Sequence, residues 1–351
     1  MTLSRENTVF QLDPMTDIRW SDFVARHPRS TVFHTREWLL ALHATYGYKP
    51  VVLTTSSGEL ADGVVFCRVR SWLTGNRLVS LPFSDHCQPL ADGVDLQTIL
   101  RSLRDQYHKV SCRYLEIRPV SNESMVDNLV GFGISEDFTL HTIDLRPSLE
   151  EIYRTFHDSC IRRKIKKAER ENLTLETGNS EGLLRKFQHL LLLTRRRHKL
   201  PPQPSAWFTN LARYLGNNLN IHLLSKDGVP AASILTIEHK NSLTYKYGCS
   251  DAQFHNLGCM PLLFWKTIQL AKQLGMEQFD LGRSSGDDPG LIAFKGHLGA
   301  KASELRYYRN PVPDRKKRSL QPNMQWARNT LACLPDPVLV GAGRLLYRHL
   351  G

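Results

Sequence analysis

The chain has few of the features that mark secreted, membrane-spanning or metal-binding proteins. Its seven cysteines form no Cys-x-x-Cys pair, and no group of cysteines and histidines has the spacing of a zinc site. No window approaches the roughly 20 apolar residues of a membrane span. The first residues contain no apolar run behind a basic flank, so no secretory signal is expected there. We therefore expect reduced cysteines, a cytoplasmic location and no metal.

Acidic residues are also in short supply. Lys and Arg number 46 against 34 Asp and Glu, which gives a formal net charge of +12 over 351 residues. Such an excess favours anionic partners, which include phosphorylated substrates, RNA and a membrane face, without choosing among them. The hydrophobic content of 41% is typical of a globular protein, and the length favours two domains.

The two halves of the chain show the same order of predicted elements. An offset of about 165 residues pairs the strand at 114–118 with that at 279–283, and the helix carrying Trp38 with that carrying Trp207. A duplicated α/β module with mixed sheets explains this pattern, and two unrelated α/β domains are the alternative. The predicted boundaries are 1–147 for an N-terminal module, 148–310 for a C-terminal catalytic module and 311–351 for a basic amphipathic tail.

A strand, a polar loop and a short helix between residues 279 and 295 form the first candidate site. A strand that runs into such a loop is where α/β proteins place their ligands. Arg283 stands at the mouth of the strand and suits a phosphate or carboxylate, because its guanidinium binds such groups through two hydrogen bonds. Alternatively, it pairs with Asp287 or Asp288.

A run of basic residues forms the second candidate site. Residues 149–172 are predicted to form one long helix, in which Arg162, Arg163 and Lys166 are exposed cations. The run at 195–199 repeats this pattern and includes Arg197 and His198. Together these residues predict a groove for tRNA or a nucleotide-sugar diphosphate, and a solvated charged face is the alternative.

The order of these elements resembles the GNAT acyltransferase module, and two modules in tandem resemble the Fem-type aminoacyl and peptidyl transferases. Such proteins have GNAT-like relatives in bacterial envelope and exopolysaccharide pathways. The resemblance covers roughly residues 15 to 309. The stretches that carry it lie at 81–85, 160–169, 195–202, 247–251 and 279–295.

This resemblance implies an acyltransferase that moves an acyl or aminoacyl group to an amine or hydroxyl of a cell-envelope or exopolysaccharide precursor. In Fem-type enzymes a Phe-Lys pair places a lysine near the transferred carbonyl or the donor phosphates, and Phe294 and Lys295 match that pair. Classical GNAT enzymes hold coenzyme A with an Arg/Gln-x-x-Gly-x-Gly/Ala loop. Residues 254–261 keep only one of its glycines, so the donor, acyl-coenzyme A or aminoacyl-tRNA, stays open.

Acyl transfer needs a group that stabilises the developing oxyanion and a route for the proton that leaves the nucleophile. Lys295 is the candidate cation, and an ordinary surface lysine is the alternative. Tyr247 is a candidate for orienting substrate, although half-buried strand tyrosines are common. Asp85 is the first-module candidate for a base or an acceptor-orienting carboxylate, and a turn-forming residue is the alternative.

The tail and two rival functions complete the expectations. The basic, apolar pattern of 311–351 suits a helix on an anionic membrane or a helix packed on the second module. One rival function is a coenzyme A-dependent N-acetyltransferase for a small amine or sugar. The other is a non-catalytic RNA-binding protein. Nothing in the sequence predicts the oligomeric state.

Overall fold

The computed structural model describes residues 8–108, 112–120, 131–313 and 335–351, which group into two compact units. Unit 1 contains Met1–Phe138, Glu304–Pro322 and Leu346–Gly351, and unit 2 contains Thr139–Ser303 and Asn323–Leu345. The division falls inside two strands rather than at the predicted boundaries near 147 and 310. Residues 314–334 of the predicted basic tail lie outside the described residues.

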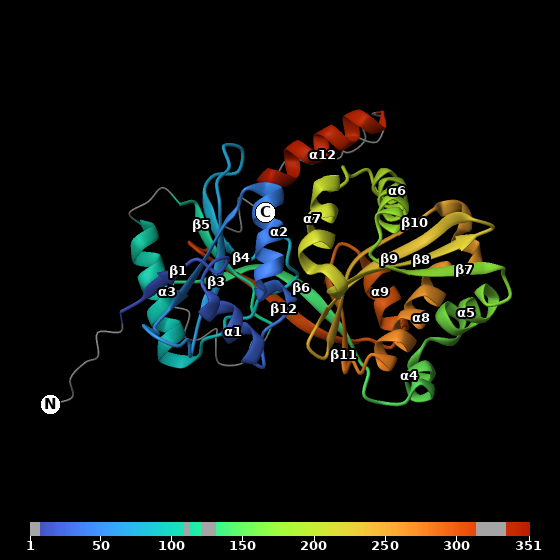
Figure 1. Ribbon diagram of the computed structural model, residues 1–351, viewed down its shortest axis with the longest axis horizontal. Helices are drawn as coiled ribbons and strands as arrows, with labels where there is room; N and C mark the ends of the chain where they lie inside the picture. The colour runs from blue at the N-terminus through green and yellow to red at the C-terminus, as the bar shows by residue number, and fades with distance from the viewer. Residues whose placement is uncertain (1–7, 109–111, 121–130, 314–334) are drawn as a thin grey trace. The chain divides into compact units, whose positions relative to one another are not determined.

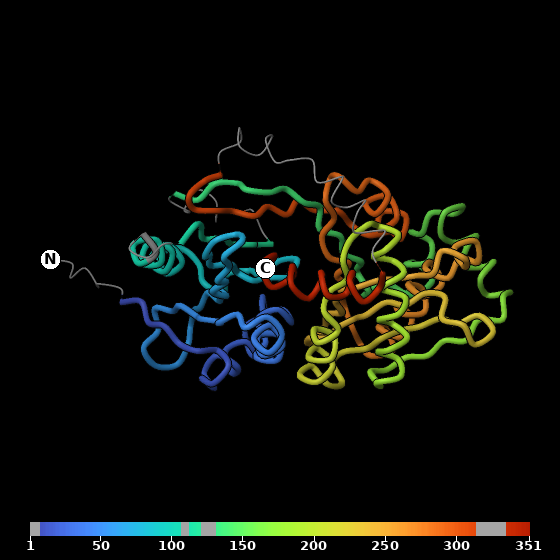
Figure 2. The backbone as a smooth tube through the Cα atoms, turned by 90° about the horizontal axis from the view of Figure 1, so that it is seen from above, coloured from blue at the N-terminus to red at the C-terminus, as the bar shows by residue number. Residues whose placement is uncertain are grey.

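Unit 1 is a mixed sheet with helices (Figure 1). Its strands follow the order β1-β2-β3-β4-β5-β12, and β4 and β5 are its parallel pair. The first elements are β1 (Phe10–Leu12), α1 (Ile18–Arg26), α2 (Arg36–Tyr46), β2 (Lys49–Thr54), β3 (Val64–Val69) and β4 (Arg77–Ser80). The remaining ones are α3 (Gly93–His108), β5 (Tyr114–Ile117), β6 (Gly133–Asp144) and β12 (Lys301–Asn310), and Figure 2 shows β6 beside β12.

Unit 2 repeats this plan with strand order β7-β8-β9-β10-β11, in which β10 and β11 are parallel. It begins with α4 (Leu149–Thr155), a π-helical turn η3 (Asp158–Arg162), α5 (Arg163–Ala168), β7 (Leu173–Gly178), α6 (Glu181–Arg197) and α7 (Ser205–Leu215). It continues with β8 (Leu219–Lys226), β9 (Val229–His239), β10 (Ser242–Ser250), a 3-10 turn η5 (Ala252–Leu257), α8 (Cys259–Gln273), β11 (Gln278–Ser285) and α9 (Pro289–His297).

The core of unit 2 explains why these segments fold as they do. Side chains that alternate along β9 and β10 pack under α8, which is apolar on most of its surface, and under α4 and α5. Trp207 and Phe208 of α7 are buried against the other face. Figure 1 accordingly shows α6 and α7 on one side of the sheet and α4, α5, α8 and α9 on the other.

The predicted duplication is confirmed by the order of elements. The series α2, β2, β3, β4, α3, β5 in unit 1 corresponds to α7, β8, β9, β10, α8, β11 in unit 2. In each series three antiparallel strands are followed by a helix and then by a strand that pairs in parallel with the third strand. Strand β12, which follows the second series, ends against β5, with Tyr308 opposite Ile117.

The predicted single helix over residues 149–172 is wrong. Phe156 and His157 adopt extended backbone angles, and they separate α4 from the π-helical turn and α5. Phe156 is buried against Trp265, and the His157 ring caps the following turn through the Cys160 N–H. Packing and capping at these two residues therefore interrupt the helix where no Gly or Pro occurs.

The final helix α12 (Asp336–Leu350) is described, and the part of the tail before it is not. Asp336 forms an ion pair with Arg196, and Gly343 lies so close to the Pro202 carbonyl that no side chain would fit. None of the helices in the described part of the chain has the length and apolar composition that crossing a bilayer requires. Contact of the tail with a membrane surface stays a prediction.

Candidate functional site

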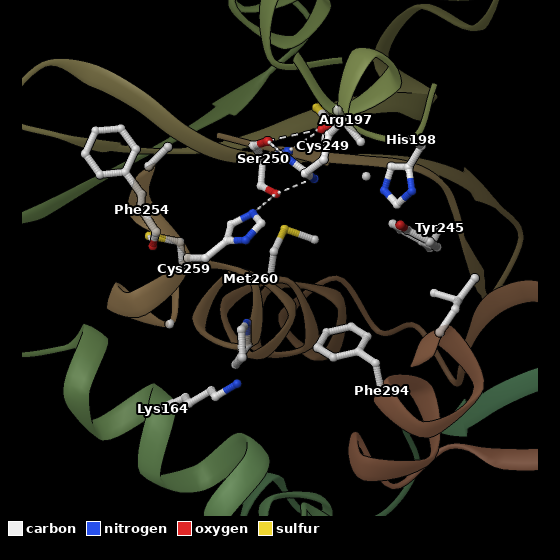
Figure 3. A pocket seen from close by; sticks show the side chains of 17 residues that line it. Lys164, Arg197, His198, Tyr245, Cys249, Ser250, Phe254, Cys259, Met260 and Phe294 are labelled. Atoms are coloured by element: carbon white, nitrogen blue, oxygen red, sulfur yellow. Dashed lines mark hydrogen bonds between the residues drawn. The ribbon is translucent and has the colours of Figure 1, made fainter. Parts of the chain in front are cut away.

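The site begins where two parallel strands of unit 2 stop pairing. Residues Ser242–Thr244 of β10 pair with Gln278–Asp280 of β11, yet β10 continues to Ser250 and β11 to Ser285. A pocket of about 370 Å³ lies beside the part of β10 that does not pair with β11. Its walls come from β10, the end of α6, the first turn of α8, α5 and α9 (Figure 3).

A bulge in β10 decides which tyrosine reaches the pocket. Opposite β9, Tyr245 pairs with Thr236 and Tyr247 pairs with Leu235, so one extra residue is inserted between the tyrosines. Because adjacent β9 residues face opposite ways, the two tyrosines do as well. Tyr245 lines the pocket, whereas Tyr247 accepts a hydrogen bond of 2.8 Å from the Trp207 indole on the other face of the sheet.

The upper wall of the pocket is a hydrogen-bonded group of polar side chains, of which Figure 3 labels Arg197, His198 and Ser250. Arg197 donates to the Ser250 carbonyl at 3.0 Å, and the Ser250 hydroxyl lies 2.9 Å from Nε2 of His255. Thr194 on α6 bonds to the backbone N–H of Ser250 at 2.9 Å, which holds the end of β10 against α6. His198 completes this wall beside Arg197.

The two histidines of this wall are held in the neutral form near neutral pH. Partial burial, and then the charges of Arg197 and Arg195, lower the pKa of His198. Partial burial and the Arg197 charge also lower the pKa of His255. A neutral imidazole can accept the proton that leaves an attacking amine or hydroxyl, which is the role of a general base.

The first turn of α8 forms the floor, together with the backbone of α5. Gly258 caps α8 with a φ of +80°, and a Cβ there would lie 2.6 Å from the Lys164 carbonyl oxygen. Only glycine therefore fits between α8 and α5. The first N–H groups of a helix lack intrahelical partners and favour anions, although Pro261 removes one of them.

The apolar wall is formed mainly by α9 and α8. Phe294 and Leu291 face the pocket, and Phe294 packs edge-on against Phe264 with ring centroids 5.6 Å apart. Two cysteines, Cys249 and Cys259, also line it. Burial raises the pKa of both thiols, so they remain protonated and serve as apolar lining, in line with the sequence interpretation.

Lys295 does not line this pocket, although it follows Phe294 directly. Its side chain is 3% exposed, and its ammonium donates hydrogen bonds of 3.0 Å to the carbonyls of Gly282 and Arg283. Successive helical residues point about 100° apart, so the pair divides between two faces of α9. Lys295 ties α9 to the end of β11, and its charge together with burial lowers the pKa of His141.

The other predicted site residues are dispersed. Arg283 is half-buried on β11 outside the pocket wall, and its carbonyl is one of the two that Lys295 binds. Asp85 lies in unit 1, where its carbonyl accepts a 2.6 Å hydrogen bond from Tyr307. Arg162 pairs with Asp158 at 3.3 Å, and Arg163 and Lys166 are exposed on α5.

The pocket thus brings together three of the predicted residues, Arg197, His198 and Phe294, and adds others that were missed. The sequence had pointed to residues 254–261 as the equivalent of a coenzyme A loop, which was the available signal for His255 and Gly258. The basic run had likewise pointed to Lys164. Ser250 lay within the family stretch at 247–251, whereas Tyr245 had no signal, because a bulge sets which residues of β10 face the pocket.

Comparison with known proteins identifies the domain that holds this pocket. Residues 157–295 match the family described as acetyltransferase (GNAT) domain. The protein carries a GNAT acyltransferase domain. The predicted transferase class is therefore confirmed, and the pocket lies entirely within the matched residues of the GNAT domain. The predicted tandem GNAT-like fold is confirmed by solved structures. A search of curated proteins gives no match.

Solved structures extend the likeness of fold beyond the GNAT domain. FemX aligns with a TM-score of 0.67 at 14% identity, over 89% of this chain and 99% of that one. A tandem GNAT protein from the clavulanic acid biosynthesis pathway aligns with a TM-score of 0.57 at 11% identity, over 88% and 99%. The C-terminal domain of a putative lysylphosphatidylglycerol synthetase from Agrobacterium fabrum gives 0.56 at 14%, over 90% and 95%.

Proposed function

We propose that this protein is a Fem-like transferase that moves an acyl or aminoacyl group to an amine or hydroxyl of a cell-envelope or exported-polysaccharide precursor. The observation that carries the proposal is the pocket of the GNAT domain, at the point where β10 and β11 stop pairing. It combines a cationic wall, an apolar wall and a neutral histidine. The likeness of fold to FemX and to the lysylphosphatidylglycerol synthetase domain supports the acceptor class.

The charge of the pocket supports a donor that carries phosphate. Arg197 and Lys164 contribute two cations from different elements, and the first turn of α8 adds the positive end of a helix dipole. Both acyl-coenzyme A and aminoacyl-tRNA place phosphates at a distance from the acyl carbon. We therefore propose that the phosphates bind along the wall formed by Arg197 and α8.

The apolar wall supports a site for the acyl group itself. Phe294, Leu291 and Tyr245 line the pocket on the side of α9 and β10, where a side chain or acyl chain would displace water. A drier site strengthens the interaction of nearby cations and dipoles with the developing oxyanion. His198 or His255 then accepts the proton from the attacking group.

The pocket also bears on the identity of the donor. Gly258 keeps the one glycine of the coenzyme A loop, and Met260 stands two residues later with its side chain in the pocket (Figure 3). A bulky residue there narrows the approach to the helix N-terminus. This arrangement leaves less room for a pyrophosphate bound against the backbone, and it favours aminoacyl-tRNA over coenzyme A thioesters.

Binding measurements on two matched variants test the proposal. Leu291→Trp fills the pocket, whereas Ala293→Trp adds the same ring to an exposed position of the same helix. We expect charged tRNA to bind the wild-type protein and Ala293→Trp with similar affinity, and Leu291→Trp to lose at least about tenfold, equivalent to 1.4 kcal/mol. Acetyl-coenzyme A and uncharged tRNA provide the comparison ligands.

The outcomes separate the three functions. Binding of acetyl-coenzyme A with a raised melting temperature, and none of charged tRNA, would support the small-molecule N-acetyltransferase instead. Equal binding of charged and uncharged tRNA, unaffected by Leu291→Trp and steeply salt-dependent, would support an RNA-binding protein without catalysis. Failure of all three ligands to bind would contradict the placement of the donor in this pocket.

A further inference from the structure

Three side chains with metal-binding chemistry meet in unit 2, away from the residues that line the pocket. They are His157, Cys160 and His297, and each offers one ligating atom within 4.8 Å of the others. The two imidazole rings have centroids 4.5 Å apart. Cys160 is a free thiol, half-buried like His297, whereas His157 is exposed.

The fold brings these residues together from two separate segments. His157 stands at the break after α4, and the π-helical turn that follows carries Cys160 three residues later. His297 is the last residue of α9, and its carbonyl accepts a 2.8 Å hydrogen bond from the His157 N–H. This backbone bond fixes the spacing of the two segments without using either ring. The sequence could not show the cluster, because His297 lies far along the chain from the other two.

The donor set suits a borderline-soft divalent ion. Two imidazole nitrogens and one thiolate are typical zinc ligands, and three protein ligands leave a fourth position for water. Ligand atoms in a tetrahedral zinc site lie about 3 to 4 Å apart, given zinc–nitrogen distances near 2.0 Å and zinc–sulfur distances near 2.3 Å. Separations of up to 4.8 Å therefore require only small side-chain rotations.

The surroundings provide further support for the ligands. Ser159 Oγ lies 3.4 Å from Nδ1 of His157, where it can accept the ring proton once Nε2 holds the metal. In this tautomer Nδ1 gives up the bond from the Cys160 N–H, which is 3.3 Å long, so metal binding exchanges one contact of Nδ1 for another. Asp158 adds an exposed carboxylate next to the site, although Arg162 pairs with it.

We propose that His157, Cys160 and His297 form a Zn²⁺ site that links the π-helical turn to the end of α9. The turn leads into α5, which carries Lys164, and α9 carries Phe294, so the ion joins the two segments that supply one cation and one aromatic wall of the pocket. The site is distinct from the pocket residues, and it does not depend on the proposed transferase activity.

Cobalt substitution tests the site directly. The full-length protein without a histidine tag, reduced and stripped of metal, is titrated with Co²⁺, which adopts zinc geometries and gives a thiolate-to-metal absorption band. We expect one equivalent of Co²⁺ to produce that band, and Zn²⁺ to displace it. Zn²⁺ should also raise the melting temperature, because it binds the folded state.

Matched variants make the result decisive. Cys160→Ser should abolish the thiolate band, and His297→Ala should weaken binding more than about tenfold. The controls are His189→Ala, an exposed histidine of α6, and Cys112→Ser, a half-buried free thiol of unit 1, and both should bind like the wild type. Absence of the band in the wild type, or its survival in Cys160→Ser, would overturn the proposal. Circular dichroism of the metal-free variants confirms that each is folded, and the two substitutions at separate segments provide independent tests.

Discussion

Replacing Lys295 by methionine tests whether this lysine is structural or catalytic. The buried ammonium donates to the carbonyls of Gly282 and Arg283, both at 3.0 Å. Methionine keeps most of the apolar stem and removes only the charged donor. The two carbonyls then lose their ammonium partner, at the position where α9 is attached to β11.

The expected cost follows from these two bonds. Hydrogen bonds that involve a charged group contribute about 1.5 to 3 kcal/mol each. Removing the ammonium also removes the desolvation cost of burying it, which offsets part of the loss. We therefore expect Lys295→Met to destabilise unit 2 by about 2 to 4 kcal/mol. For a unit of this size that corresponds to a melting temperature lower by about 5 to 15 °C.

Calorimetry beside a transfer assay distinguishes the two roles. Lys301→Met, at an exposed position of β12, is the control and should melt like the wild type. If Lys295 is instead the cation that stabilises the oxyanion, its loss should reduce transfer at least about tenfold and leave the fold unaffected. An unchanged melting temperature together with that loss of activity would refute the structural reasoning and would place Lys295 against the substrate.

The remaining predictions concern the pocket floor, the bulge and acid stability. Gly258→Ala should lower the melting temperature more than Gly275→Ala. Both glycines have positive φ, which alone costs about 1 to 2 kcal/mol, but of the two only the methyl group at position 258 would meet backbone within 3 Å. Equal losses by calorimetry would contradict the contact at Gly258. Tyr245→Ala should weaken donor binding, measured by titration. Tyr247→Phe should leave donor binding unchanged and lower the free energy of unfolding by about 0.5 to 1.5 kcal/mol, measured by denaturant unfolding. The reverse pattern would contradict the bulge register. Burial lowers the pKa of His222 to about 4, so its stabilising contribution is full above about pH 6.5 and is lost as the pH falls towards 4, by about 2 kcal/mol at pH 5. His222→Gln should therefore flatten the fall in melting temperature between neutral pH and pH 5, and an unchanged slope would exclude this histidine as its source.

The duplicated architecture could be predicted from the sequence because local sequence patterns specify its elements. Strand alternation, turn residues and helical spacing recur in both halves. The helices that carry Trp38 and Trp207 provided a reference for the offset between the halves. The position of β12 in the sheet could not be predicted in this way. Pairing of β12 with β5 depends on contacts between residues far apart in the chain, such as Tyr308 and Ile117.

The candidate site was only partly predictable, for three physical reasons. The β10 bulge puts Tyr245 and Tyr247 on opposite faces of the sheet, so strand alternation could not show that Tyr245, rather than the predicted Tyr247, lines the pocket. The helix break at His157 depends on capping and burial rather than on Gly or Pro. Finally, the matching of Phe294 and Lys295 to a family pair gave no information on which of them faces the pocket.

The close contact of Gly258 with the Lys164 carbonyl has a consequence for how this protein can diversify. The contact is made by main-chain atoms of α5, so it does not depend on which side chains α5 carries. Exposed positions of that helix, such as Arg163 and Lys166, can therefore change in charge or size while the floor of the pocket keeps its shape. Selection for a different substrate could therefore act on α5 without first having to repack the core.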